Sequence, residues 1–525
     1  MNPSKRQLSR FAATFAGGTL LSRVLGLVRD MVLAALIPTV ARDAFLFAFK
    51  FPNMLRDMLG EGAANAAFVP VLSEVQEKEP EASYREAVSA CLSAMLLLFG
   101  GLTALGVVLM PLLPWVLEAI RPLTGQEPKS AEELGATVQL LRWTFPYLFF
   151  IGLAVFAMAP LFTSKHYATP SWSPVLLNVA LIACCLLFHK RFPNPAWALV
   201  VGVWLGGIAQ LVVMFAAMKR YAGVLLPNFK LGHPAVLKSF WLLGPVILGQ
   251  ATGEVNKMVD NVFAYSLPEG TVTALFYANR LVQLPLSIFG IAVSVAILPT
   301  IARAGARGDH GEIRDMLMHG LRQTFFLVAP AMVGLILLRA PLIRLLFERG
   351  NFDAESTQRA ATALLFYGLG LLSFSWVRVS VQGFYAIQDT KTPVIIASCS
   401  MLLNIVLNCL LVGPLGFRGL ALSTSISFTL NFVCLYGLLG RRFGALWDAA
   451  FLGGLARMAV ATAGMGVVTY ATALAAEHYG GGMTAWGRGA SALLPIVAAV
   501  VAYAALCRLL KVPELRQYLE AFRRG

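Results

Sequence analysis

The chain has 525 residues, of which 58% are hydrophobic and only 13% are charged, and its mean hydropathy is +0.71. Soluble domains have about 25% charged residues, and no soluble core could bury so much apolar surface. This composition excludes a soluble enzyme or soluble binding module and predicts an all-α polytopic membrane protein. The formal net charge of +15 fits basic loops that orient the chain and contact anionic headgroups better than it fits nucleic-acid binding.

The N-terminal segment "MNPSKRQLSRFAATFAGG" has a basic start but no small-residue cleavage site, so we expect it to be retained in the first span. With about 20 apolar residues per span, the sequence predicts about fourteen transmembrane helices. They lie near residues 11–38, 42–70, 87–117, 135–163, 170–188, 195–218, 238–266, 271–302, 314–338, 357–387, 392–412, 417–440, 450–475 and 486–510. Because this number is even and the segments on the N-terminal side carry more Lys and Arg, we predict that both termini are cytoplasmic.

The first predicted helix contains two arginines, Arg23 and Arg29, in the run "GGTLLSRVLGLVRDMVLAALIP". An arginine at bilayer depth costs roughly 2.5–3.5 kcal/mol, so each is expected to hold a negatively charged partner. That partner is either an anionic ligand or a neighbouring carboxylate, such as Asp30 beside Arg29. The two arginines are about 240° apart on an ideal helix, so both face one cavity only if the helix bends, for which Gly26 is the candidate.

Polar side chains form stripes along three other predicted helices, which is typical of helices that line a water-filled space. The second helix places Lys50, Asn53, Asp57, Glu61 and Asn65 on one face with Arg56 beside them; the seventh has Gln250, Glu254, Lys257 and Asn261 with Asp260 to one side; the eighth has Arg280, Gln283, Ser287 and Ser294. The excess of basic residues predicts an anionic ligand, and the simpler alternative is that acids on the same helices neutralise them.

An internal repeat relates the first six predicted helices to the next six. Asp30 matches Asp260 and Lys50 matches Arg280 at one offset of 230 residues, and "SKHYATPSWSPVLLNV" recurs as "AIQDTKTPVIIASCSMLLNI". Six spans is an even number, so the halves have the same topology and are predicted to form two six-helix lobes related by a parallel repeat around a central cavity. The predicted domains are residues 1–235 for the N-terminal lobe, 236–445 for the C-terminal lobe, and 446–525 for two extra helices with a basic tail.

Four segments carry a family resemblance: "SRVLGLVRD", "DAFLFAFKFPNMLRDMLGEGAANAAFVPVL", "YANRLVQLPLSIFGIAVSVAILPT" and "GFYAIQDTKTP". From about residue 10 to 510 the chain resembles the MurJ (MviN) family of lipid II flippases, within the multidrug/oligosaccharidyl-lipid/polysaccharide exporter superfamily. The resemblance implies fourteen helices in two lobes and a cationic cavity that carries lipid II, a lipid-linked peptidoglycan precursor, to the outer leaflet by alternating access. The chain departs from some relatives at Asp57, where they look dibasic.

By motif, the resemblance places the family's cavity arginines at Arg23, Arg29, Arg56 and Arg280 and its acidic positions at Asp43 and Glu61. Together with the polar stripes, this predicts a substrate-binding set of Arg23, Arg29, Arg56, Arg280, Lys50, Asn53, Glu61, Asp43 and Gln283. The planar guanidinium of arginine binds phosphate oxygens bidentately, which suits a pyrophosphate. The last two helices are rich in Ala and Gly, which fits either a groove for the polyprenyl tail or ordinary close helix packing.

A cation site is a further expectation, since the resemblance suggests sodium in some members. Asp260, Asn404, Asn408 and Thr424 offer oxygen ligands for a small hard cation. Interhelical hydrogen bonds among these side chains are the alternative. No cofactor is expected to be required, and the energy source is expected to be sodium or the membrane potential.

The same sequence features are compatible with two other transporter functions. An exporter of another lipid-linked oligosaccharide and a cation-coupled drug antiporter of the same superfamily remain as alternatives, although an antiporter cavity should carry uncompensated carboxylates. The chain has no H-E-x-x-H motif, P-loop, catalytic-triad order or Cys/His cluster, so we expect a transporter rather than an enzyme. The expected partners are lipid II, membrane lipids and cell-wall synthesis proteins, with no nucleic acid, for a monomer in the bacterial cytoplasmic (inner) membrane that serves cell-wall biogenesis and cell shape.

Overall fold

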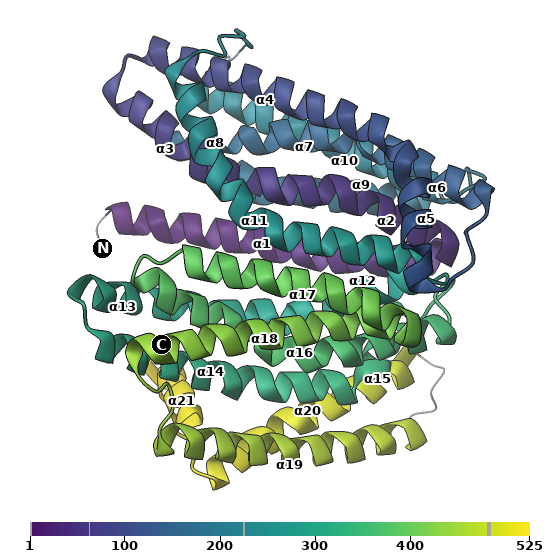
Figure 1. Cartoon of the computed structure of the whole chain (residues 1–525), viewed down its shortest axis with the longest axis vertical. Coiled ribbons are helices and arrows are strands. Elements are labelled where there is room, and N and C mark those ends of the chain that lie inside the picture. The colour runs from purple at the N-terminus through teal and green to yellow at the C-terminus, as the bar shows by residue number, and fades with distance from the viewer. Residues whose placement is uncertain (1–2, 62, 224–225, 480–484, 525) are drawn as a thin grey trace. The chain divides into compact units, whose positions relative to one another are not determined.

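The computed structural model describes residues 3–61, 63–223, 226–479 and 485–524. Within these ranges, the description of side chains leaves out residues 3–16, 60, 61, 63, 248, 479, 485, 486, 519 and 521–524. All regular structure in the described part is helical (Figure 1). The predicted all-α class is therefore confirmed.

The chain divides into two compact units. Unit 1 comprises Met1–Glu269 with Arg349–Phe352, and unit 2 comprises Gly270–Glu348 with Asp353–Gly525. The helices of unit 1 are α1 (Pro3–Leu36), α2 (Thr39–Arg56), η1 (Asp57–Glu61), α3 (Ala63–Lys78), α4 (Glu81–Leu109), η2 (Met110–Leu112), α5 (Leu113–Thr124), α6 (Ala131–Thr144), α7 (Tyr147–Phe156), α8 (Met158–Thr163), α9 (Ala168–Phe188), α10 (Ala196–Ala222) and α11 (Pro234–Ser266).

Unit 2 contains the remaining helices. They are α12 (Thr271–Pro285), η3 (Leu286–Gly290), α13 (Ile291–Arg307), α14 (His310–Leu337), α15 (Arg339–Phe347), α16 (Ala354–Ala386), α17 (Lys391–Leu415), α18 (Phe417–Phe443), α19 (Ala449–Tyr479), α20 (Ala485–Leu509) and α21 (Pro513–Arg524). The first compact unit thus ends after α11, whereas the sequence repeat assigns that helix to the second predicted lobe. The boundary of the compact unit is defined by contacts in space, whereas the boundary of the predicted lobe is defined by the sequence repeat, so the two need not coincide.

Eleven helical segments of the described residues are long and apolar enough to span a membrane, or twelve if the bent helix α11 is included. The two other predicted spans correspond to α1 and to the α2–η1–α3 segment, which carry the intramembrane charges singled out in the sequence. The multi-pass membrane class is confirmed, and the count of fourteen spans stays a prediction.

The two halves of the sequence share unusual backbone features at matching positions. The π-helical turns η1 and η3 both follow a cationic helix, and their residues Gly60 and Gly290 are 230 residues apart, as are Lys50 and Arg280. A π-turn inserts one residue into a helix and frequently occurs at functional sites. The repeat therefore extends from residue types to the local shape of the backbone.

A second pair of matching features precedes α9 and α17. Lys165 and Gln388 have positive φ angles of 58° and 57°. The next residue in each turn donates its backbone N–H to a carbonyl five residues earlier, His166 to Leu161 at 2.8 Å and Asp389 to Phe384 at 3.0 Å. The same turn is thus built with a histidine in unit 1 and an aspartate in unit 2.

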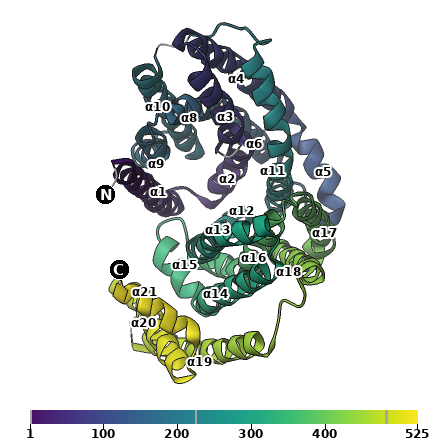
Figure 2. The ribbon, with the colours of Figure 1, turned by 90° about the vertical axis from the view of Figure 1, so that its left-hand side faces the viewer.

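The last helices of unit 2 pack beside its α14 and α15, as the yellow ribbons of Figure 2 show. Helices α19 and α20 pack against each other, and α21 is joined to α14 by an ion pair between Glu514 and Arg322 at 2.6 Å. A separate apolar core forms here from residues such as Phe326, Met458 and Tyr503. These helices therefore belong to the C-terminal unit through specific contacts.

Candidate functional site

The arginine Arg29 on α1 is held by two neighbours. Its Nε and Nη2 donate to Asp30 Oδ1 at 3.0 and 2.7 Å, and its Nη1 donates to Asn178 Oδ1 of α9 at 3.1 Å. Asn178 Nδ2 in turn donates to the backbone carbonyl of Ser22 at 3.1 Å. The expected alternative, neutralisation by Asp30, is therefore realised at Arg29, and the pair is fixed against α9.

The other arginine of α1, Arg23, has an exposed side chain. Helix α1 runs from Pro3 to Leu36 as one element through Gly26, and it packs mainly against α9. Helices α1 and α9 come close together at Gly18, where a Cβ atom would lie 2.6 Å from the carbonyl oxygen of Ser171 on α9. A larger residue there would push α1 away from the helix that holds Arg29.

A cluster of charged side chains from α2, η1 and α11 lies in unit 1, around Lys50. The ionisable groups within electrostatic reach of Lys50 are Lys257, Glu254, Asp57 and Arg56. Arg56 Nη2 contacts Asp57 Oδ1 at 2.7 Å, and Lys257 pairs with Glu254 on the same helix. Among the side chains described here, two of the three cations of the cluster have an acidic partner, and Lys50 adds a positive charge.

Helices α2 and α11 are also joined by a hydrogen bond, since Asn261 Nδ2 donates to the backbone carbonyl of Phe47 at 3.2 Å. The structure thus brings together the predicted polar stripes of the second and seventh helices. Asn53, one turn from Lys50 on α2, has a buried Oδ1 atom with no hydrogen-bond partner in the described part of the chain. A buried amide oxygen without a donor is costly, which makes Asn53 a candidate contact for a bound ligand.

Two acidic residues complete the predicted set in unit 1. Asp43 is 6% exposed and lies on α2. The side chain of Glu61 lies outside the described residues. Asp43 and Lys50 therefore lie on the same helix, about two turns apart by helix geometry.

In unit 2, Arg280 lies on α12 with a partly buried side chain, and Gln283 on the same helix is exposed. Both precede the π-turn η3, in which Gly290 lies close to α16: a Cβ atom there would be 2.7 Å from Ser375 Oγ. Ser294 Oγ donates to the backbone carbonyl of Arg378 on α16 at 3.0 Å. The eighth predicted span is thus tied to α16 immediately after its cationic segment.

Two comparisons decide the family. A family model described as lipid II flippase MurJ matches residues 33–487. A protein of Haemophilus influenzae named probable lipid II flippase MurJ is 37% identical over 435 residues, which cover 80% of this chain and 83% of that protein. The chain belongs to the lipid II flippase MurJ family.

Solved structures agree with this assignment. A lipid II flippase MurJ in an inward closed conformation has a TM-score of 0.76 and 26% identity, covering 94% of this chain and 98% of that one. An inward-facing multidrug resistance MATE family transporter of the MOP superfamily has a TM-score of 0.65 and 14% identity, covering 81% of this chain and 95% of that one. The second likeness shows the fold alone, and the resemblance predicted from the sequence is confirmed.

The residues expected for a cation in this MurJ-family chain are distributed over three helices. Asn408 Nδ2 donates to Asn404 Oδ1 at 3.1 Å within α17, and Thr424 Oγ1 donates to the backbone carbonyl of Leu420 at 3.0 Å. Asp260 lies on α11 of unit 1. The bond between the two asparagines lies within one helix, so the cation site and the interhelical alternative both stay predictions.

Two arginines in the MurJ-family chain were missed by sequence reasoning. Arg42 is completely buried, donates to the carbonyls of Ala34 and Ile37 at 2.9 and 3.0 Å, and lies 5.2 Å from the centre of the Phe352 ring. Arg378 has an exposed side chain within the apolar span α16, and no described carboxylate pairs with it. An arginine inside a span is a signal for function, so Arg378 could have been found from its position, whereas the backbone partners of Arg42 could not.

Proposed function

We propose that this chain moves lipid II from the cytoplasmic to the outer leaflet of a bacterial cytoplasmic membrane. The substrate follows from membership in a family whose members are named lipid II flippases. The observation that supports a direct role for this chain's own residues is the cluster around Lys50, whose described side chains carry one more positive than negative charge, together with Asn53 one turn along α2, whose amide oxygen has no partner among the described residues. A lipid-linked pyrophosphate with a sugar-peptide head supplies both an anion and hydrogen-bond donors.

The basic residues would bind the pyrophosphate and Asn53 the polar head. Guanidinium groups make short, charge-assisted hydrogen bonds to phosphate, and those of Arg23, Arg29, Arg56 and Arg280 are the proposed donors, with Lys50 as a point charge. Asn53 Oδ1 would accept from a hydroxyl or amide of the head group. Asp43, Glu61 and Gln283 complete the proposed set as groups that orient these contacts.

Transport would proceed by alternating access, in which two repeated halves expose the bound head group first to one side and then to the other. The matching π-turns η1 and η3 support equivalent roles for the two repeats. Sodium or the membrane potential would supply the energy, and Asp260, Asn404, Asn408 and Thr424 would be the ligands of a bound sodium ion. No chemical bond needs to be made or broken, so the chain would act as a transporter and not as an enzyme.

The polyprenyl tail would lie along α19 and α20. The glycines on α19 divide into two kinds: a Cβ at Gly464 would lie 2.7 Å from Leu506 of α20, whereas a Cβ at Gly453 would meet nothing within 4 Å. Gly464 therefore serves helix packing, and the side of α19 that contains Gly453 has room for an acyl chain. The chain would work as a monomer with both termini in the cytoplasm, among membrane lipids and near cell-wall synthesis proteins.

The function is tested by expressing this chain in cells depleted of their own lipid II flippase. We expect growth to be restored and lipid II to become accessible to an added enzyme that cleaves it outside. Asn53→Leu, which has similar volume but no amide, should insert normally and reduce that accessibility. Accumulation of a different lipid-linked intermediate, or lipid II confined to the inner leaflet despite normal insertion of the chain, would overturn the proposal.

A further inference from the structure

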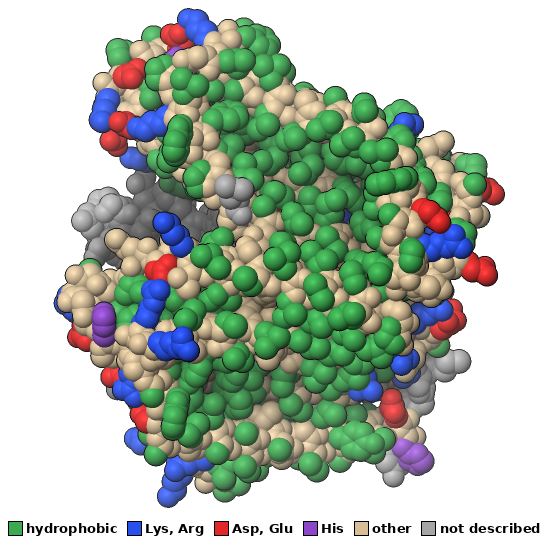
Figure 3. All heavy atoms as spheres, viewed as in Figure 1, with side chains coloured by type: hydrophobic (Ala, Val, Ile, Leu, Met, Phe, Trp, Pro, Cys, Tyr) green, Lys and Arg blue, Asp and Glu red, His purple; other side chains and the backbone are tan. Residues whose placement is uncertain are grey.

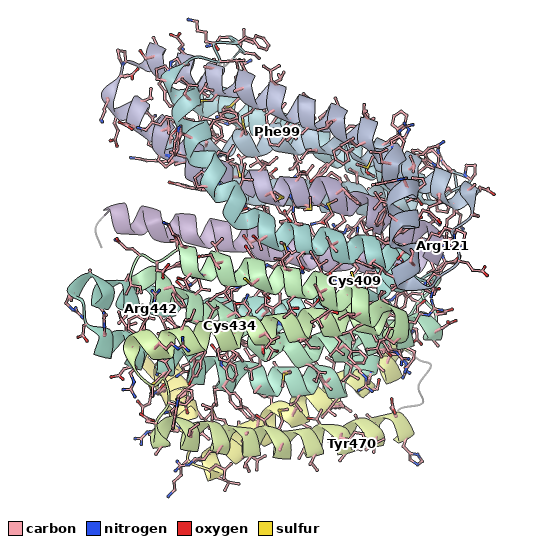
Figure 4. All side chains as sticks on the ribbon, viewed as in Figure 1. Phe99, Arg121, Cys409, Cys434, Arg442 and Tyr470 are labelled. Atoms are coloured by element: carbon pink, nitrogen blue, oxygen red, sulfur yellow. The ribbon has the colours of Figure 1, made fainter. Side chains whose placement is uncertain are left out.

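A groove of about 1070 Å³, part of it open to the surroundings, runs between α17 and α18 of unit 2. Its lining is largely apolar and includes Cys399 and Leu403 of α17 and Leu430, Cys434, Gly437 and Arg441 of α18. Figure 4 labels Cys434 midway along α18 and Arg442 close to its end. We call this feature the α17–α18 groove.

The groove lies on a face that is suited to lipid. Leu402 and Val406 of α17 are 58% and 53% exposed, and Val433 of α18 is 55% exposed. Figure 3 shows apolar side chains across the face formed by these helices, with Lys and Arg side chains gathered at the end where α18 finishes. Such a surface is stable only in the hydrocarbon of a membrane.

The length of the groove matches one leaflet. Leu430 and Arg441 are eleven residues apart on α18, which corresponds to about 16 Å along a helix. Half of the hydrocarbon core of a bilayer is about 15 Å thick. If Arg441 lies at headgroup level, the groove therefore extends along the acyl chains of a single leaflet.

Two adjacent arginines at this end of α18 differ in their partners. Arg442 is paired with Asp389 at 2.6 Å and lies 5.3 Å from the centre of the Phe384 ring. Arg441 is exposed, lines the groove, and has no carboxylate partner among the described residues. Arg442 thus stabilises the turn before α17, and Arg441 is available to an external anion.

We propose that the α17–α18 groove binds an anionic glycerophospholipid, with the phosphate at Arg441 and one acyl chain between Cys434 and Leu430. This site is separate from the residues proposed for lipid II and does not depend on that function. A basic residue at the membrane surface favours anionic over zwitterionic lipid about fivefold. The bound lipid would cover α17, which carries Asn404 and Asn408 and packs mainly on α18.

A polar transmembrane helix of another protein is the competing occupant. Asn431 lies at the inner end of the groove, is 6% exposed, and has an Oδ1 atom without a hydrogen-bond partner in the described structure. An acyl chain cannot bond to this amide, whereas a hydroxyl or amide on a helix could after rotation of the side chain. The two occupants therefore differ in their dependence on Asn431.

Native mass spectrometry of the purified full-length chain in mild detergent tests the proposal, with phosphatidylglycerol and phosphatidylcholine added separately. The wild-type chain should bind one phosphatidylglycerol about fivefold more tightly than phosphatidylcholine. Arg441→Gln should abolish this preference, and the matched control Arg442→Gln should retain it despite the same loss of charge. Equal loss in the two variants, or retention in Arg441→Gln, would overturn the assignment.

The acyl part of the site is tested by a second matched pair. A Cβ at Gly437, in the groove, or at Gly440, outside its lining, would meet nothing within 4 Å, so a side chain can begin at both positions without a clash. Gly437→Leu should displace the bound lipid and Gly440→Leu should not. Lipid retained in Gly437→Leu would contradict the site, and loss of binding in Asn431→Leu would contradict a lipid occupant.

Discussion

The π-turn of the second predicted span and that of the eighth have the same backbone form and different chemistry. In η1 the sequence is "DMLGE", preceded directly by Arg56, whereas in η3 it is "LSIFG", with Arg280 six residues before it. Charges in unit 1 therefore lie on and around the turn, beside those of α11, while unit 2 carries a cation ahead of an apolar turn. The repeat therefore preserves the position of the π-turn, whereas the side chains around it differ between the two units.

The turns before α9 and α17 differ in the same way. Asp389 accepts from the backbone N–H of Thr392 at 3.0 Å and from its hydroxyl at 2.7 Å, and with Arg442 nearby these contacts lower the pKa of Asp389 to about 2. In unit 1, burial and the neighbouring Arg220 lower the pKa of His166, which stacks on Tyr221 with ring centres 3.9 Å apart. One backbone turn thus supports a carboxylate in one half and an imidazole with a lowered pKa in the other.

The largest effect is expected at Arg29, because its ion pair with Asp30 gives this proposed lipid II contact a structural role in unit 1. Asp30 is 1% exposed, so Arg29→Ala would leave a buried carboxylate without its main partner. We expect the free energy of unfolding to fall by about 3–5 kcal/mol. Thermal unfolding of the purified chain measures this loss. Asp30→Asn combined with Arg29→Ala should recover part of it, and no recovery would mean that Asn178 rather than Asp30 is the essential partner.

A smaller effect is expected at Arg378, which tests whether unit 2 uses one cation or two. If its guanidinium contributes to anion binding, Arg378→Ala should reduce lipid II transport roughly tenfold, because a hydrogen bond to a charged group is worth about 1.5–3 kcal/mol. Outer-leaflet exposure of lipid II is the measurement, with Arg303→Ala, an exposed arginine on α13, as the control. Normal transport in Arg378→Ala would leave Arg280 as the single proposed cation of the second repeat.

The smallest effect concerns the pH dependence of the two turns. The pKa of His166 is lowered in the folded state, so the unfolded chain binds more protons as the pH falls below about 6.5, and folding is destabilised there. The pKa of Asp389 is also lowered, so its stabilising effect is present above about pH 4 and is lost only as the pH falls toward 2. The melting temperature of the wild-type chain should fall between pH 7 and 5.5, and His166→Gln should make this fall smaller. Asp389→Asn should leave the dependence of the melting temperature on pH unchanged over the same range.

The sequence predicted the helical class, the family and the identity of the cationic helices, because these depend on composition, on the lengths of apolar segments and on local motifs. It also predicted Asp30 as a possible partner of Arg29, because adjacent residues are close in space whatever the fold. The bond from Arg29 to Asn178 spans 149 residues, and the position of Arg42 depends on backbone carbonyls, so neither has a sequence pattern. The π-turns were missed for a similar reason, because "DMLGE" and "LSIFG" share little besides a glycine.

The central claim is that basic residues of both repeats hold the pyrophosphate of lipid II, and Arg280 tests it most directly because it belongs to the second repeat. The measurement is outer-leaflet exposure of lipid II in flippase-depleted cells that express Arg280→Ala, Arg280→Lys or the wild-type chain at equal membrane levels. We predict normal insertion of both variants, lipid II retained in the inner leaflet with Arg280→Ala, and impaired exposure with Arg280→Lys, because lysine keeps the charge but lacks the bidentate fork. A well-inserted Arg280→Ala chain that exposes lipid II at the wild-type rate and sustains growth would contradict the account.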